Sequence, residues 1–214
     1  MNSIVSEKKF IQERLGIPYQ NLSQSYLRAE TELTALSTYN FYLQAGQVAA
    51  PIVTERLLNL NDQFVITHFT IGLKYLGTTA TPTAAQHLAM PVYTYVDNNV
   101  MTGNGLNAEA LYNSNLSFII DRKQYLPEFP IRSFKRVPTT QSATNSGYAT
   151  GPITSNGYDN GLYGFFPSEP TLIDGRQTLD LAINLNAATT INTASKYISA
   201  VFELRGYLVV NAKS

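Results

Sequence analysis

A chain of 214 residues can bury one substantial hydrophobic core, and an all-β protein of this size is commonly a single domain. Its 15 basic and 15 acidic residues cancel, which excludes a global field that would draw nucleic acid or an anionic membrane. The absence of cysteine excludes disulfides and cysteine-ligated zinc sites, and no stretch approaches the roughly 18 apolar residues of a membrane span. We therefore expect no cofactor and no membrane span.

The N-terminal segment predicts a short amphipathic helix. Asn2 or Ser3 can cap this helix, and Gly16 followed by Pro18 ends it. A helix this short is marginal in isolation, so its apolar side chains must pack on their own domain or on a neighbouring copy of the chain. Both alternatives stay open. The candidate subunit contacts on this helix are Ile4, Phe10, Ile11 and Leu15.

Residues 22–37 predict a second helix, because apolar side chains recur near one helical face, although Glu30 intrudes on that face. The apolar side chains are Leu22, Tyr26, Leu33 and Leu36. We therefore divide the chain into a helical arm, residues 1–37, and a single β-sandwich domain, residues 38–214.

From Tyr39 onward the hydrophobic period changes to two, as expected of half-buried strands. The clearest alternation covers residues 63–76. One face of this run is predicted to carry Val65, Phe69, Ile71, Leu73 and Tyr75, and the other His68, Thr70 and Lys74. Further strands are predicted at residues 39–44, 54–60, 92–96, 116–126, 131–137, 162–166, 178–185 and 196–210. Strands in this number, without helices of crossover length between them, predict an all-β protein with an antiparallel sandwich.

Three connections are unusually long, at residues 77–91, 97–115 and 139–162. Loops beyond about 12 to 15 residues without their own secondary structure are uncommon and usually functional or disordered. The last of them carries Tyr148, Tyr158 and Tyr163 among small polar residues, a composition typical of adaptable binding surfaces. We predict that these tyrosines contact other subunits. The alternative is a flexible insertion that orders only when it packs against another copy.

Motifs for nucleotide or metal binding lack the context that their chemistry needs. Gly103, Gly105 and Ala108 have the spacing of a dinucleotide-binding fingerprint, but no β-α-β alternation surrounds them to direct a helix N-terminus at a pyrophosphate. A loop with a short helical turn is the favoured interpretation. His68 and His87 have no metal-ligand spacing, and we interpret both as surface residues.

The sequence contains no motif that identifies catalytic residues. Asp159, Glu169 and Asp174 offer the alternative of a calcium site or a glycosidase carboxylate pair, but they form no D-x-D-x-D loop. No G-x-S-x-G turn is present to activate a serine. We predict that the chain is not an enzyme.

One concentration of basic residues interleaves cations with aromatic side chains between residues 122 and 136. Arg132, Lys135 and Arg136 are its candidates for a local contact with single-stranded nucleic acid, because cations follow phosphates while aromatic rings stack on bases. The favoured alternative is the solvated edge of a strand pair, where charge discourages unwanted pairing between sheets.

The order of these features resembles jelly-roll virion proteins, particularly those of bacteriophages. The resemblance lies in the short amphipathic arm, the alternating strands, the long Asn/Thr/Ser loops and the final strand in "YISAVFELRGYLVVNAKS". It implies a jelly-roll sandwich that serves as a structural subunit of a virion. It further implies assembly with copies of itself through the arm and the loops, and contacts with other virion proteins.

Composition agrees with an assembling role. Only 14% of the residues are charged, and neutral amides and hydroxyls avoid the desolvation penalty of buried unpaired ions in large wet interfaces. Charges within residues 1–32 cancel, so the arm favours a protein partner over nucleic acid. The alternatives are a lectin-like or receptor-binding module and, less favoured, a carbohydrate-active enzyme on a sandwich fold.

Overall fold

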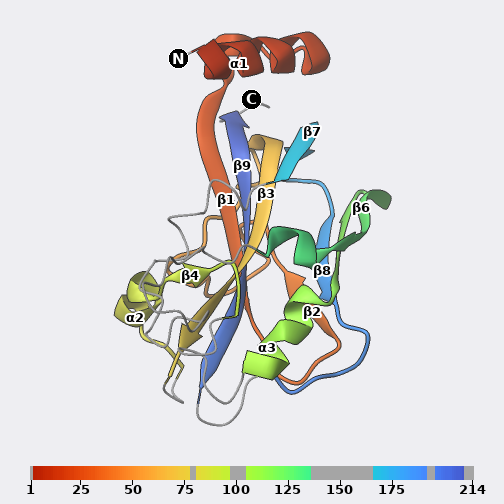
Figure 1. Ribbon diagram of the computed structural model, residues 1–214. Helices are drawn as coiled ribbons and strands as arrows, with labels where there is room; N and C mark the ends of the chain where they lie inside the picture. The colour runs from red at the N-terminus through yellow and green to blue at the C-terminus, as the bar shows by residue number, and fades with distance from the viewer. Residues whose placement is uncertain (1, 78–80, 97–104, 136–165, 192–195, 210–214) are drawn as a thin grey trace, which may run out of the picture.

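Strands begin at residue 23 and recur along most of the chain. The computed structural model describes residues 2–77, 81–96, 105–135, 166–191 and 196–209. Two antiparallel sheets packed against each other dominate this part of the chain (Figure 1). In chain order the elements are α1 (Asn2–Leu15), η1 (Tyr19–Asn21), β1 (Ser23–Glu32), β2 (Thr38–Phe41), β3 (Gln63–Leu76), α2 (Ala84–Ala89), β4 (Val92–Tyr93), α3 (Gly105–Tyr112), β5 (Asn115–Ile120), β6 (Lys123–Pro130), η2 (Ile131–Phe134), β7 (Phe166–Asp174), β8 (Leu179–Asn184) and β9 (Tyr197–Val209).

The strands pair in a nested order. The first sheet has the order β1-β9-β3-β4, with β7 also paired to β3, and the second sheet has the order β2-β8-β5-β6. Four antiparallel pairs lie inside one another along the chain: β1 with β9, β2 with β8, β3 with β7, and β5 with β6. Successive pairs alternate between the two sheets. The predicted all-β antiparallel sandwich is therefore confirmed.

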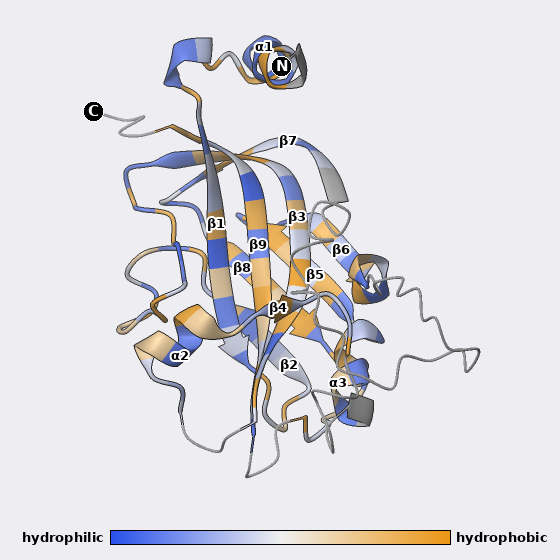
Figure 2. Cartoon of the chain, turned by 60° about the vertical axis from the view of Figure 1, so that its left-hand side comes forward, coloured by the Kyte–Doolittle hydropathy of each residue, from blue (hydrophilic) through white to orange (hydrophobic). Residues whose placement is uncertain are grey.

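The hydrophobic core lies between the two sheets, where apolar residues of β3, β5 and β9 gather (Figure 2). Phe41 of the second sheet meets Phe202 of the first with ring centroids 5.9 Å apart, and Phe69 meets Phe129 at 5.5 Å. The alternation predicted for residues 178–185 is confirmed in β8, because its apolar side chains are buried while Asp180 is exposed. Period-two patterning therefore predicts the core face of this strand correctly.

A β-bulge changes the faces of β3. The pairing of β3 with both β7 and β9 shifts between Ile66 and His68. One extra residue in a strand moves the following side chains to the opposite faces. Ile66 therefore shares the core with Phe69, whereas Val65 packs outside it in a second apolar cluster. The prediction that Val65 and Phe69 share a face was wrong, because strict alternation ignores the bulge.

The second predicted helix is a strand. Residues 23–32 form β1, which pairs with β9 along its whole length. Ladder pairing with a distant strand overrides the local spacing of apolar side chains. Only Asn2–Leu15 forms the predicted helical arm. The segment that precedes the first strand is therefore shorter than the predicted arm, residues 1–37.

Several other segments differ from their predictions. Residues 131–134 form the 3₁₀ turn η2, which buries Ile131 and Phe134, and residues 54–60 contribute isolated bridges in place of a strand. The loop at 77–91 contains α2, and the loop at 97–115 contains α3. Most of the loop at 139–162 and of the strand predicted at 162–166 lies outside the described residues. None of the described helices combines the length and apolar character needed to cross a bilayer.

Candidate functional site

The arm helix α1 lies across one end of the first sheet (Figure 1). Ile11 is fully buried there, and Leu15 packs on the same apolar cluster, which contains Leu22, Val65, Tyr207 and Val209. We call these four residues the arm patch.

Two polar contacts also hold the arm. The Tyr207 hydroxyl donates to the Glu7 carboxylate at 2.7 Å, and Lys8 Nζ donates to the Leu22 carbonyl oxygen at 2.6 Å. Burial raises the pKa of Tyr207, and the hydrogen bond to Glu7 raises it further, so the tyrosine remains a donor. The arm is thus fixed to its own domain along one side.

The predicted contact residues of the arm divide into two groups. Ile11 and Leu15 face the arm patch. In contrast, Ile4 is 44% exposed and Phe10 is 47% exposed, and Val5, next to Ile4, is also 44% exposed. The two alternatives for the apolar side chains therefore apply to different residues of the same helix. Packing on the chain's own domain describes Ile11 and Leu15, and Ile4 and Phe10 remain accessible to a partner.

The other predicted contacts are only partly described. Lys135 follows η2 and donates to both carboxylate oxygens of Glu109 at 2.6 and 2.8 Å, so its charge is paired. Arg132 is an exposed residue within η2. The remaining predicted contact residues, Arg136, Tyr148, Tyr158 and Tyr163, lie outside the described residues.

The carboxylates considered for calcium or catalysis do not converge. Glu169 and Asp174 lie five residues apart on the extended strand β7, which separates them by about 16 Å. Glu169 pairs with Arg14 at 3.4 Å, and the Asp174 carboxylate accepts a hydrogen bond from Gln63 Nε2 at 3.2 Å. Asp159 lies outside the described ranges, and within them no three His, Cys, Asp or Glu side chains are grouped to hold a metal.

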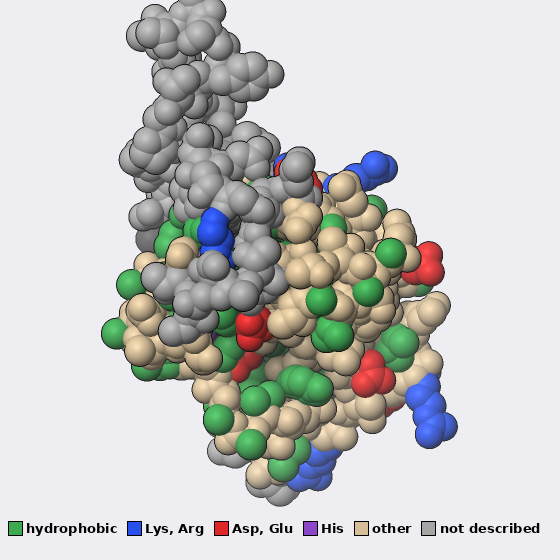
Figure 3. Space-filling view, turned by 90° about the horizontal axis from the view of Figure 1, so that it is seen from below, with side chains coloured by type: hydrophobic (Ala, Val, Ile, Leu, Met, Phe, Trp, Pro, Cys, Tyr) green, Lys and Arg blue, Asp and Glu red, His purple; other side chains and the backbone are tan. Residues whose placement is uncertain are grey.

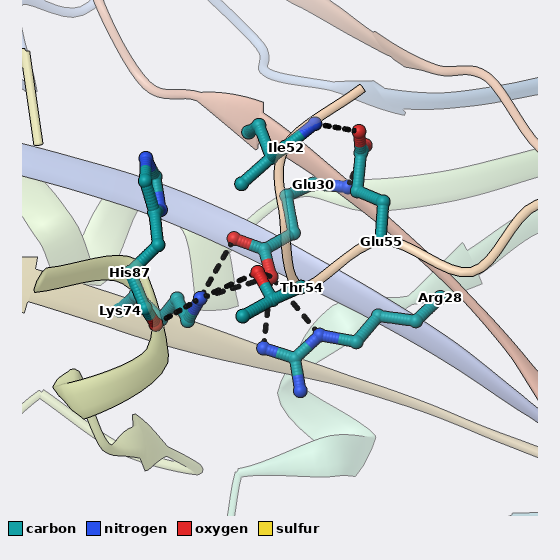
Figure 4. Close-up of polar contacts among 7 residues, drawn as sticks. All are labelled: Arg28, Glu30, Ile52, Thr54, Glu55, Lys74 and His87. Atoms are coloured by element: carbon teal, nitrogen blue, oxygen red, sulfur yellow. Dashed lines mark hydrogen bonds and ion pairs between the residues drawn. The ribbon is translucent and has the colours of Figure 1, made fainter. Parts of the chain in front are cut away.

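A buried group of charges on the outer face of the first sheet has no counterpart in the sequence predictions. We call it the ion cluster; its members are Arg28, Glu30, Thr54, Glu55 and Lys74 (Figure 4). The side chains of Glu30 and Lys74 are 0% and 1% exposed, and Lys74 Nζ lies 3.0 Å from each Glu30 carboxylate oxygen. Arg28 reaches the same carboxylate at 2.8 Å. Lys74, predicted on the wet face of its strand, is therefore buried with a partner.

The turn at residues 52–55 closes over the cluster. Thr54 Oγ1 donates to Glu30 at 2.5 Å and accepts from Lys74 Nζ at 3.0 Å. The Glu55 carboxylate accepts from the backbone N–H groups of Glu30, at 2.9 Å, and Ile52, at 2.7 Å. Every oxygen of the two carboxylates thus has a donor, as buried charges require.

The electrostatics of the cluster follow from burial and pairing. Burial raises the pKa of Glu30, but the Thr54 hydrogen bond and the charges of Arg28 and Lys74 outweigh it and lower the pKa overall. Burial lowers the pKa of Lys74, although Glu30 opposes that shift. Burial raises the pKa of Glu55 despite its two backbone donors. Glu30 is therefore the anionic centre, and its neighbours are arranged around it.

His87 lies beside the cluster and is buried, so the prediction of a surface histidine was wrong. Its helix α2 begins with a capping box, in which the Thr83 side chain accepts from the Gln86 backbone and the Gln86 side chain accepts from the Thr83 backbone. The His87 ring meets the ring of Tyr197 edge-on, with centroids 5.6 Å apart. The capping box can be recognised in the sequence, but which side of so short a helix packs on the sheet cannot.

A pocket of about 350 Å³ opens between α2, β4 and the ion cluster. Cluster residues line one side, and the chain from His87 to Val92 lines the other. In the pocket, Arg28, Thr54 and Lys74 of the cluster therefore face a mostly apolar wall.

No model of a known protein family matches the chain, and no curated protein matches it.

Proposed function

We propose that the chain is a structural subunit of a virus or bacteriophage particle, built on a jelly-roll sandwich and assembling with copies of itself. The nested strand pairing is the observation that carries this proposal. Without the short β4, eight strands form the pairs 1–8, 2–7, 3–6 and 4–5 in chain order, alternating between two sheets. A jelly roll has eight strands in two such sheets, and viral capsid proteins commonly use it as a rigid subunit.

The arm supports the assembly part of the proposal. α1 is anchored by Ile11 but leaves Ile4, Val5 and Phe10 exposed by more than two fifths each. Fully burying such a side chain contributes about 1.5 to 3 kcal/mol before ordering costs, and a symmetric assembly repeats that contribution at every subunit.

The surface chemistry is compatible with large wet contacts. On the face seen in Figure 3, isolated charged side chains lie among uncharged polar and apolar atoms. Neutral polar groups lose less free energy on desolvation than unpaired ions do. This composition favours protein partners over nucleic acid.

A double substitution tests the role of the arm without removing its anchor. Changing Ile4 and Phe10 together to Ser should leave the sandwich folded but abolish assembly, as measured by sedimentation velocity at matched concentrations. The matched control changes Leu36 and Leu60 to Ser, because these side chains are 54% and 57% exposed and lie outside the arm. This control should assemble like the unaltered chain. Negative-stain images should show closed particles for the control and for the unaltered chain.

Two results would contradict the proposal. Full assembly of the Ile4→Ser, Phe10→Ser chain would remove the arm from the interface. An unaltered chain that stays monomeric at every concentration and binds glycans would favour the lectin-like alternative, because lectin domains also use the jelly roll.

A further inference from the structure

One ammonium group attaches α2 to the sheet. Lys74 Nζ donates to the Glu30 carboxylate, to Thr54 Oγ1 and, at 3.1 Å, to the main-chain carbonyl oxygen of His87. These partners belong to β1, to the turn at residues 52–55 and to α2 (Figure 4). A single side chain thus joins two surface segments to the outer face of the first sheet.

The His87 side chain is docked in its neutral form. Only 7% of the residue is exposed, and its buried Nδ1 has no hydrogen-bond partner within the described ranges. An imidazolium carries a proton on both ring nitrogens, so protonation would leave a buried N–H without an acceptor. It would also place a second positive charge near the Lys74 ammonium. The docked helix therefore disfavours a charged His87.

Together, the surroundings of His87 disfavour protonation of its ring. Lys74 on β3 repels a positive charge on the ring, Glu30 on β1 attracts it, and the Tyr197 ring on β9 lies perpendicular to the imidazole. Burial is the largest effect and, with Lys74, lowers the pKa of His87 below the ordinary 6.5. Because the pKa of His87 is lowered in the docked helix, the neutral imidazole makes its full contribution to the stability of the docked state above pH 6.5. That contribution is lost progressively as the pH falls below 6.5.

We propose that α2 is an acid-released latch: protonation of His87 undocks the helix and removes one wall of the pocket beside the ion cluster. The latch depends on contacts within one chain, so it stands independently of the proposed role in assembly. Undocking uncovers the side of the pocket that Arg28, Thr54 and Lys74 of the cluster line.

The carboxylates of the cluster cannot produce the same response. The lowered pKa of Glu30 means that its pairing is lost only below pH 4.5. The raised pKa of Glu55 has the opposite effect, because protonation of this carboxylate in acid stabilises the docked state. Release between pH 6.5 and 4.5 is therefore specific to His87.

Amide hydrogen exchange of the full chain, followed by mass spectrometry and corrected for the intrinsic pH dependence, measures the release. Exchange across α2, relative to β9, should rise about tenfold for each pH unit below 6.5, until the imidazole also titrates in the docked helix. His87→Phe retains a ring against Tyr197 and cannot be protonated, so its α2 exchange should not change with pH. His87→Gln provides a second variant that does not titrate.

The other histidine supplies the matched control. His68 lies on β3 beside Thr67 and belongs neither to the ion cluster nor to α2, so His68→Gln should keep the full response. Corrected α2 exchange that is constant with pH in the unaltered chain would overturn the latch. An equal acid response in both His87 variants would overturn it as well.

Discussion

Lys74 is a buried cation whose energetic role follows from desolvation. Removing two charges from water opposes folding, and their mutual attraction repays this only where the remaining donors and acceptors are satisfied. Around Lys74 and Glu30 they are, through Thr54, Arg28 and the His87 carbonyl. The pair therefore contributes little net free energy while intact, but it becomes destabilising when one partner is removed.

Lys74→Met should lower the free energy of unfolding by about 3 to 5 kcal/mol, because it leaves the Glu30 carboxylate buried with one cation fewer. Lys135→Met is the matched control, since it also removes a lysine from a carboxylate pair, but one whose side chains are each 32% exposed. That control should lose about 1 kcal/mol or less. Urea denaturation measures both, and equal losses would show that burial of the Lys74 pair is not what makes it sensitive.

At the scale of elements, prediction from the sequence succeeds where a strand has one dry face and one wet face. β8 follows this rule, and β3 follows it after its bulge, from His68 to Ile71, whereas residues 64–66 before the bulge are all buried. β1 alternates as well, with Leu27 and Ala29 in the core, but the helical spacing of the apolar residues in 22–37 led to the wrong prediction. β7 was missed because Pro167 and Pro170 interrupt its pattern.

The bulge of β3 depends on the glycine opposite it. Gly206 pairs with Ile66, and a Cβ atom at Gly206 would lie 1.8 Å from the Val65 carbonyl oxygen. Gly206→Ala should therefore push the two central strands apart and lower the free energy of unfolding by about 2 to 3 kcal/mol.

Gly77→Ala is the control for this substitution. The nearest atom to a Cβ at Gly77 is the Tyr75 hydroxyl oxygen at 3.7 Å, an ordinary contact, so the free energy of unfolding should change by about 0.5 kcal/mol or less. Thermal melts of both variants give the comparison. A Gly206→Ala chain as stable as the Gly77→Ala chain would mean that the strands separate at the bulge without strain.

At the scale of the molecule, the sequence predicted the class of fold and the arm, but it could not predict how the site is assembled. The ion cluster unites residues from β1, the turn at 52–55 and β3, which approach one another only through the ladders of the first sheet. A lysine in an alternating strand has the same sequence pattern whether it is solvated or buried with a partner. His87 was misplaced for the same reason, since its burial depends on β9 and on Lys74.

The docking of the arm onto the rest of the molecule can be tested, because the same substitution at two neighbouring residues of α1 should change the stability by very different amounts. Ile11 is completely buried on the arm patch, so Ile11→Ser should lower the free energy of unfolding by about 2 to 4 kcal/mol through lost burial and a buried hydroxyl. Phe10 is 47% exposed, so Phe10→Ser should change it by about 0.5 kcal/mol or less. Urea denaturation at a concentration where the chain is monomeric separates the two effects. Equal stabilities would mean that the arm leaves its own domain in solution and that Ile11, like Phe10, is available to a neighbouring copy.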